Sequence, residues 1–258
     1  MNRPKLSIIV PVYNEERHLR AVLERLAVGP YPPDEQEVIV VDDGSSDRTP
    51  GILAEWGPRP GFVIRTHPVN RGKGAAVRTG LGLATGAVAV VQDADLECDP
   101  ADIPAVVGPI FRGSFLAVFG SRYLRPGSLP WSRFRVAVSL LNGLVRVLYG
   151  VRLTDVNCCY KAARTELFRD LDLRCERFEF CAEVAAKLCR GGVRVGEVPV
   201  RYTPRTRAEG KKIGWRDAVQ FGATLIRWRF RAVPDLRAFG AVPPEPVRLG
   251  EPLASQGK

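Results

Sequence analysis

Short apolar segments alternate along this chain with segments in which apolar residues recur at helical spacing. Several apolar segments end abruptly at polar residues, and residues 87–91 form a continuous apolar run typical of a strand covered on both faces. This alternation predicts a mostly parallel, doubly wound α/β sheet flanked by helices, whose ligands bind beyond the carboxyl ends of the strands. The expected strands are residues 6–10, 37–41, 62–65, 87–91 and 115–120, and the expected helices include 73–84, 131–149, 162–171, 178–190 and 215–231.

Two carboxylates follow the strand at residues 87–91, in the sequence Asp93-Ala94-Asp95. Their i, i+2 spacing lets both turn toward one divalent ion, and hard oxygen ligands favour Mg²⁺ or Mn²⁺. A tripeptide of this kind is also common in solvated turns. Its position directly after five apolar residues favours the metal interpretation, because buried carboxylates need a cation or hydrogen-bond donors to compensate them.

Two other strand ends carry polar clusters. Asp42-Asp43-Gly44-Ser45-Ser46-Asp47 offers carboxylates to the hydroxyls or base of a nucleoside, with Asp47 suited to cap the next helix. Pro11-Val12-Tyr13-Asn14-Glu15 places an aromatic ring and an amide where a nucleoside wall could form. Because parallel strands end at the same edge of a sheet, the three clusters are expected to form one site.

Together these segments resemble the family 2 glycosyltransferases of the GT-A fold, and the joint match is highly specific. The similarity covers about residues 5–230 and is greatest to the polyprenyl-phosphate branch, the dolichyl-phosphate mannosyltransferase and glucosyltransferase type. Further matching segments are Asn70-Arg71-Gly72-Lys73-Gly74, Gly120-Ser121-Arg122-Tyr123, Leu153-Thr154-Asp155 and Cys159-Tyr160-Lys161.

The resemblance implies roles for several of these positions. The donor nucleotide would be held by one group of residues, with Asp93 and Asp95 binding Mg²⁺ or Mn²⁺ and Glu97 joining them where relatives often carry Gln. Lys73 is included in the donor group, with a merely solvated lysine as the alternative, because Gly72-Lys73-Gly74 lacks the spacing of a phosphate loop. The donor group comprises Pro11, Tyr13, Glu15, Asp42, Asp43, Asp93 and Lys73.

The domain organisation follows from the same comparison. We expect one GT-A domain over residues 1–232, in which residues 5–125 bind nucleotide-sugar and metal and residues 126–232 face the acceptor and membrane. Prolines recur along residues 233–258, and this pattern predicts a loosely ordered tail.

Basic residues point to an anionic acceptor. The chain carries 38 Lys+Arg against 28 Asp+Glu, and its second half is the more basic. A phosphate monoester needs cations to neutralise and orient it, and Arg provides bidentate geometry. Arg122 is the leading candidate, and Asp155 could orient the sugar or acceptor or be a buried structural carboxylate. The expected phosphate-binding residues are Arg122, Arg205, Arg207, Lys211 and Lys212, the last four in a basic loop after the last strand.

The membrane relationship is expected to be peripheral. No segment approaches the roughly 20 apolar residues of a spanning helix, and no signal peptide is evident, so we expect a cytoplasmic chain on a membrane face. The helices 131–149 and 215–231 are basic and amphipathic, which favours contact with an anionic bilayer over burial in the core for the second one. A separate anchoring partner is an open possibility. The six cysteines show neither zinc-site nor disulfide spacing and are interpreted as buried thiols.

The expected reaction is inverting transfer of a hexose, from a donor of the UDP-glucose or GDP-mannose class, to a polyprenyl phosphate. The catalytic residues would be Asp95, Arg122 and Asp155. Transfer to a saccharide hydroxyl in cell-wall or capsule assembly is the enzymatic alternative, and it would require a carboxylate base. A basic membrane- or nucleic-acid-binding module is the non-enzymatic alternative, but it gives the acidic clusters no purpose, and nucleic acid is not an expected partner.

Overall fold

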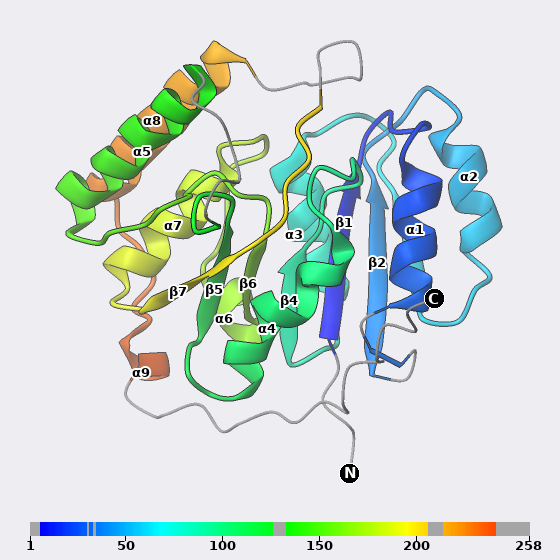
Figure 1. Ribbon diagram of the computed structural model, residues 1–258, viewed down its shortest axis with the longest axis horizontal. Coiled ribbons are helices and arrows are strands. Elements are labelled where there is room, and N and C mark those ends of the chain that lie inside the picture. The colour runs from blue at the N-terminus through cyan, green and yellow to red at the C-terminus, as the bar shows by residue number, and fades with distance from the viewer. Residues whose placement is uncertain (1–5, 30, 33–34, 126–132, 206–213, 241–258) are drawn as a thin grey trace.

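The computed structural model describes residues 6–29, 31–32, 35–125, 133–205 and 214–240. Within these residues, a 7-stranded sheet has the order β3-β2-β1-β4-β6-β5-β7 (Figure 1). Its neighbours pair in parallel except β6, which is antiparallel to both β4 and β5. The strands are β1 (Leu6–Val12), β2 (Gln36–Asp42), β3 (Phe62–Thr66), β4 (Val88–Val91), β5 (Ala117–Ser121), β6 (Lys161–Arg164) and β7 (Val195–Pro199). The expected α/β fold with a mostly parallel sheet is confirmed.

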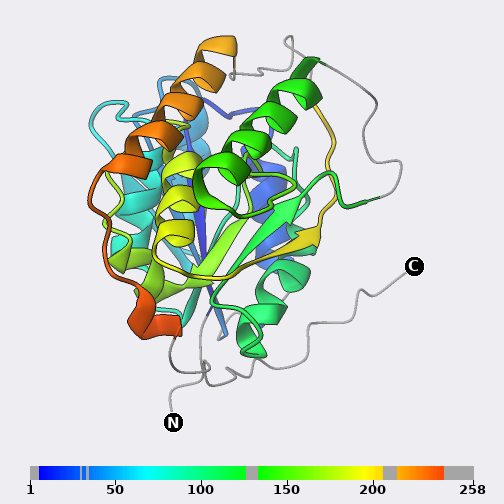
Figure 2. The same cartoon turned by 90° about the vertical axis from the view of Figure 1, so that its left-hand side faces the viewer.

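Helices cover both faces of this sheet. One face carries α1 (Leu19–Val28), α2 (Thr49–Trp56) and α4 (Ile103–Phe111). The opposite face carries α3 (Lys73–Leu83), α6 (Thr165–Asp170) and α7 (Phe180–Arg190), with α5 (Arg133–Tyr149) and α8 (Trp215–Phe230) packed beside one another at one end (Figure 2). A 3-10 turn, η1 (Pro100–Asp102), precedes α4, and the short α9 (Arg237–Gly240) ends the described chain.

Alternate side chains of the central strand β1 point to opposite faces of the sheet, which separates the core into two parts. Ile8 and Val10 pack in the core under α1 and α4, whereas Ile9 packs in the core under α3 and α7. All three side chains are buried, as expected for a parallel strand covered on both faces. Gly80 of α3 allows close packing here, because a Cβ at that position would lie 2.5 Å from Ile9 Cγ2. The small residues of α3 therefore bring this helix against β1.

The expectation for residues 162–171 was wrong in its first part. Residues Lys161–Arg164 form β6, and only Thr165–Asp170 is helical. Alanine and arginine have good helix propensity, but this segment pairs with β4 on one side and β5 on the other, so tertiary pairing overrides local preference. The helix α4 was not anticipated either.

The chain after α8 continues into the core before the described residues end. Leu236 is fully buried and lies against Gly191, where a Cβ would meet the leucine side chain at 2.6 Å. Residues 233–240 therefore include a packed segment within the part expected to be a loose tail. The rest of that expected tail, residues 241–258, lies outside the described residues, as do residues 131–132 of the expected helix 131–149.

Candidate active site

A pocket of about 380 Å³ opens at the carboxyl ends of β1, β2 and β4. This is the edge at which an open α/β sheet binds its ligands, and the volume suits a small-molecule site. Most of the expected site residues border it, from both halves of the chain. The lining residues include Pro11, Tyr13, Glu15, Asp43, Lys73, Asp93, Asp95, Glu97, Arg122 and Arg205.

The loop after β1 is fastened to the loop after β2 by hydrogen bonds. The Asn14 amide donates to Ser45 Oγ at 2.9 Å, and Asn14 Oδ1 accepts from the Ser46 amide at 2.8 Å. Asn14 has a φ of 50°, in the left-handed region that asparagine tolerates better than most residues. The Glu15 amide donates to Thr49 Oγ1 at the start of α2. These contacts fix Tyr13 and Glu15 at the pocket wall.

The two aspartates after β2 have different surroundings. Asp43 borders the pocket and accepts the amides of Arg71 and Gly72, while its Oδ1 lies 2.7 Å from His67 Nδ1. Asp42 is fully buried and is not among the lining residues, which argues against the direct donor contact expected of it. One of its oxygens accepts from the Ser45 amide, and the other has no hydrogen-bond partner among the residues described here.

The Asp93-Ala94-Asp95 turn is tightly constrained. Leu96, the next residue, has a φ of 59°, a conformation that is costly for a branched side chain and that concentrates at functional sites. The Glu97 amide donates to Asp95 Oδ1 at 3.0 Å, which turns the glutamate back toward the aspartate. This strained turn presents all three expected metal ligands to one pocket.

Lys73 is not solvated, contrary to the alternative considered for it. Its ammonium lies 2.6 Å from Asp93 Oδ1, and the side chain is largely buried. Burial alone would lower the pKa of Lys73, but the adjacent Asp93 carboxylate outweighs it and raises that pKa. Lys73 therefore remains charged and holds Asp93 in place from the start of α3.

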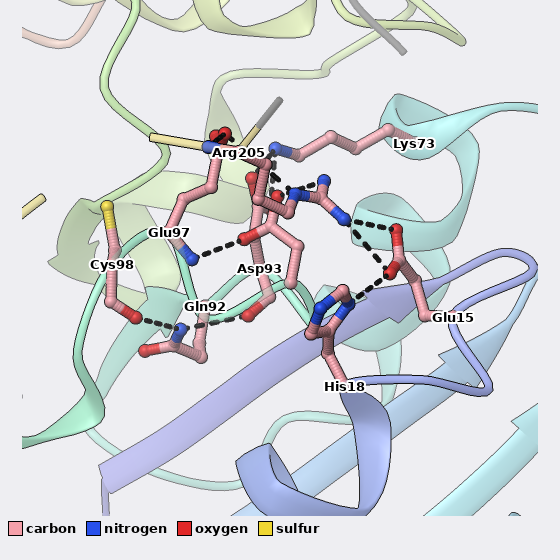
Figure 3. A network of polar contacts seen from close by, with 9 residues as sticks. Glu15, His18, Lys73, Gln92, Asp93, Glu97, Cys98 and Arg205 are labelled. Carbon is pink, nitrogen blue, oxygen red and sulfur yellow. Dashed lines mark hydrogen bonds and ion pairs between the residues drawn. The ribbon is translucent and has the colours of Figure 1, made fainter. Parts of the chain in front are cut away.

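Arg205 joins the acidic residues of the pocket. Its guanidinium lies 2.7 Å from Asp95 Oδ2 and 3.1 Å from Glu15 Oε2, and its backbone amide donates to Glu97 Oε1 at 3.0 Å (Figure 3). The chain before it is tied to the same turn, since the Thr203 amide donates to the Glu97 carbonyl. In this structure Arg205 contacts the expected metal ligands, whereas the sequence suggested an acceptor-phosphate role.

The charges of this cluster fit a divalent cation. Among the residues described, four carboxylates, those of Glu15, Asp93, Asp95 and Glu97, meet two cations, Lys73 and Arg205. Burial, followed by the neighbouring Asp93 charge, raises the pKa of Asp95 to about 7. The carboxylate oxygens of this cluster are the donors that suit Mg²⁺ and Mn²⁺.

Arg122 and Asp155 form a buried pair beside the pocket. Arg122 borders the pocket, whereas Asp155 is 0% exposed and lies behind it. Glu197 accepts the amides of Thr154 and Asp155 and so holds this segment against β7. The structure thus places Asp155 as a partner of Arg122, out of direct reach of the pocket.

Three of the expected phosphate-binding residues, Arg207, Lys211 and Lys212, lie outside the described residues. Sequence reasoning missed His67, which links Asp43 to Thr79 Oγ1 at 2.9 Å. It also missed Asn157, Phe178 and Tyr202 in the pocket wall, because no local motif marks any of them as a site residue.

The end of the molecule formed by α5 and α8 exposes apolar side chains. Leu140 is 70% exposed and Val147 82% in α5, and Phe230 is 79% exposed in α8. Phe221, Leu225 and Trp228 of α8 are buried in the core, so the preference for membrane contact was wrong for those three residues. In the part of the chain that the structure describes, every helix is too short or too polar to cross a membrane.

The fold and pocket define a class: a doubly wound α/β protein with a carboxylate-rich pocket at the carboxyl edge of its sheet. The sequence profile of Glycosyl transferase family 2 matches residues 7–171, which cover the strands that build this site. The chain therefore belongs to Glycosyl transferase family 2, as the sequence motifs implied.

Three relatives whose names state an activity match most of this chain. The chain is 34% identical over 210 residues to undecaprenyl-phosphate 4-deoxy-4-formamido-L-arabinose transferase of Edwardsiella ictaluri, covering 80% of this chain and 62% of that protein. It is 30% identical to dodecaprenyl-phosphate galacturonate synthase of Rhizobium johnstonii, covering 80% and 61%. It is also 30% identical to glycosyltransferase AglD of Haloferax volcanii, covering 89% of this chain and 38% of that protein. The match thus spans about three fifths or less of these relatives.

Solved structures share the fold. Glucosyl-3-phosphoglycerate synthase from Mycobacterium tuberculosis, in complex with Mn²⁺, uridine diphosphate and phosphoglyceric acid, aligns with a TM-score of 0.66 and 22% sequence identity. The alignment covers 89% of this chain and 80% of that one. The GT-A expectation is therefore confirmed at the level of the fold.

Proposed function

We propose that this protein transfers a hexose, with inversion, from a nucleotide-diphosphate sugar to a polyprenyl phosphate. The single observation that carries the proposal is the gathering of Asp93, Asp95 and Glu97 in a pocket at the carboxyl edge of the sheet. Two relatives named for sugar transfer to undecaprenyl and dodecaprenyl phosphate support the acceptor class.

The metal would be held by Asp95 and Asp93, with Glu97 beside them. Bound there, Mg²⁺ or Mn²⁺ would act as a Lewis acid toward the diphosphate leaving group. Lys73 keeps Asp93 oriented and adds positive charge to the side of the pocket where a diphosphate would lie. Tyr13 and Pro11 would form the wall against the nucleoside, and Asp43 fixes the loop of residues 70–72 that closes the same wall.

The chain has to position the acceptor more than activate it. A phosphate monoester with a second pKa near 6 is already largely dianionic at neutral pH, so its oxygen needs little help from a base. Arg122, held rigid by Asp155, would fix the acceptor phosphate beside the sugar. Such positioning contributes much of the rate in reactions between two bound partners.

Arg205 would have two roles, one in the metal-free site and one next to the acceptor phosphate. Without metal it pairs with Glu15 and Asp95. It also directly precedes in the sequence the segment that carries Arg207, Lys211 and Lys212, the cations expected at the acceptor phosphate. In this account the acceptor-binding role expected for the basic loop stays a prediction.

The exposed apolar side chains of α5 and α8 support peripheral attachment to the membrane that contains the lipid acceptor. Leu140, Val147 and Phe230 project from helices that also carry exposed arginines such as Arg146 and Arg229. Apolar side chains among cations suit the surface of an anionic bilayer, and we infer that this surface is the cytoplasmic one. Sedimentation with anionic vesicles would test this, with Leu140→Asp weakening binding and the exposed Glu166→Asp leaving it unchanged.

Product analysis tests the proposed reaction. The protein would be incubated with UDP- or GDP-hexoses, Mg²⁺ or Mn²⁺ and a polyprenyl phosphate, and the lipids analysed by mass spectrometry. A polyprenyl-phosphate hexose is the expected product. Absence of a lipid product under every pairing, together with a glycosylated saccharide when an oligosaccharide is supplied, would reject the lipid acceptor.

A further inference from the structure

Cys98 and the adjacent pair Cys158 and Cys159, distant from it in the sequence, meet next to the active site. The sulfurs of Cys98, Cys158 and Cys159 all lie within 4.8 Å of one another, and all three residues are buried. All three are free thiols. The chain spacing gave no sign of this cluster, because Cys98 follows β4 and the other two precede β6. Pairing of β4 with β6 brings the two segments together.

Side chains around the cluster hold the Cys98 backbone in place. Gln92 Nε2 donates to the Cys98 carbonyl at 3.2 Å, and the Tyr160 hydroxyl donates to Gln92 Oε1 at 2.5 Å. In Figure 3 the carbonyl of Cys98 faces the Gln92 amide, and its sulfur lies at the other end of the residue. The backbone of Cys98 is therefore satisfied within the protein, and its thiol faces the other two.

A buried charge beside the cluster is the second observation. Lys161 is fully buried, donates to the Cys158 carbonyl at 2.6 Å and lies 4.1 Å from the centre of the Phe119 ring. Within the described ranges it forms no ion pair with a carboxylate. A fully buried ammonium requires a compensating negative charge, and thiolates next to it can supply one.

We infer that Cys98, Cys158 and Cys159 form a binding site for a thiophilic divalent cation with a filled d shell, of which Zn²⁺ is the representative. Zinc–thiolate bonds are about 2.3 Å long, so three thiolates around one ion lie about 3.8 Å apart at tetrahedral angles. The thiols would close by about 1 Å or less from the observed limit of 4.8 Å.

The charges near the cluster favour a divalent ion over a monovalent one. Three thiolates and one divalent cation carry a net charge of −1, which the Lys161 ammonium, also near Glu197, partly offsets. A monovalent ion would leave one more negative charge in the core, and Arg122 would not offset it because Asp155 neutralises Arg122.

Such an ion would be structural. Cys98 directly follows Glu97, and Cys158 lies three residues after Asp155, so an ion held by the three thiolates would cross-link the metal-ligand turn to the segment that orients Arg122. This soft site is separate from the oxygen-rich cluster of Asp93 and Asp95, which suits hard ions.

Zinc titration of the full-length protein tests the inference independently of the proposed reaction. Apo protein in a phosphine reductant and excess Mg²⁺ would be titrated with Zn²⁺ in competition with a chromophoric chelator. We expect one tight equivalent, with affinity lowered about 100-fold or more in Cys98→Ser and Cys159→Ser. Cys189→Ser, a cysteine in α7 outside the cluster, is the matched control and should bind as the wild type does.

Co²⁺ binding to the same proteins gives a spectroscopic check, because a thiolate-to-cobalt absorption band requires the cysteine ligands. If a serine variant fails to fold, thiol alkylation of the wild type replaces it. One equivalent of Zn²⁺ should then slow modification of the three clustered cysteines at least tenfold and leave Cys189 unaffected. Equal zinc binding by wild type and Cys98→Ser, no thiol protection, or a Cys98 disulfide in the unreduced protein would overturn the inference.

Discussion

Arg122 donates two parallel hydrogen bonds to Asp155, from Nε to Oδ2 at 2.6 Å and from Nη2 to Oδ1 at 2.7 Å. The Arg122 amide donates to the same carboxylate at 3.0 Å. This two-point contact fixes the plane of the guanidinium at the pocket wall, which a lysine could not reproduce. Asp155 thus supports the active site by orienting Arg122.

Replacing Asp155 with asparagine is expected to destabilise the protein and to impair use of the acceptor. Loss of one partner leaves Arg122 buried with an uncompensated charge, which costs about 3–5 kcal/mol of unfolding free energy. Chemical denaturation measures this loss, and the KM for polyprenyl phosphate should rise more than the KM for the donor. Asp172→Asn, which breaks the exposed pair of Asp172 with Arg174, should leave both KM values unchanged. An acceptor KM that does not respond to Asp155→Asn would remove Arg122 from the acceptor site.

Lys73→Met should make the protein depend on the divalent ion for stability. The change removes one positive charge from the acidic cluster and costs about 1–3 kcal/mol without metal, because Asp93 loses its partner. Thermal unfolding with and without Mn²⁺ measures the effect, and metal should raise the Tm of the variant more than that of the wild type. Lys187→Met breaks another buried pair, with Glu183, and should lower Tm equally in both conditions. The same metal response in Lys73→Met and wild type would contradict this role.

Metal affinity should rise with pH. Burial and the Asp93 charge raise the pKa of Asp95 to about 7, so protons compete with the metal for this carboxylate below that pH. Mn²⁺ affinity is expected to increase about tenfold between pH 6 and pH 8. Without metal the sign is opposite: the folded state retains this proton between about pH 4 and pH 7, so the contribution of Asp95 to stability falls as pH rises. Calorimetric Mn²⁺ titrations should show no such slope for Asp95→Asn, and a flat wild-type profile would exclude the raised pKa.

Two glycines of α3 should respond oppositely to alanine. At Gly74 a Cβ would lie 2.3 Å from the Cys175 carbonyl oxygen, so Gly74→Ala must displace the backbone beside the pocket and should cost about 1–3 kcal/mol. At Gly82, in the same helix, a Cβ would meet nothing within 4 Å, and Gly82→Ala should stabilise by up to about 1 kcal/mol. Denaturation midpoints compare the two, and a neutral Gly74→Ala would show that the helix can move freely away from Cys175.

Local sequence patterns predicted most strands and most pocket residues, but not the contacts between distant segments. Apolar runs followed by polar clusters located β1, β2 and β4 and most of the pocket residues, because parallel strands end at one edge. The short β6 was missed, since only its pairing with β4 and β5 makes Lys161–Arg164 a strand. The partner of Arg122 and the contact of Arg205 with Asp95 depend on segments more than 30 residues apart, and no local pattern encodes them.

The three-cysteine cluster shows the same limit. Its members lack metal-site spacing, and only the antiparallel pairing of β6 with β4 brings Cys158 and Cys159 to Cys98. The burial of apolar side chains in α8 was missed for a related reason. Its apolar and basic residues alternate as on a membrane-binding helix, but contacts with α5 and α7 bury Phe221 and Trp228.

The initial rate of lipid-linked sugar formation, with and without metal, tests the central claim most directly. Chelation should abolish product formation, Mg²⁺ or Mn²⁺ should restore it, and Asp95→Asn should lower the restored rate by about 100-fold or more, a loss of about 2.7 kcal/mol of transition-state stabilisation. Asp170→Asn, at an exposed carboxylate in α6, should match the wild type. Full activity in the presence of chelator, or an Asp95→Asn rate equal to that of the wild type, would contradict metal-dependent transfer at this site.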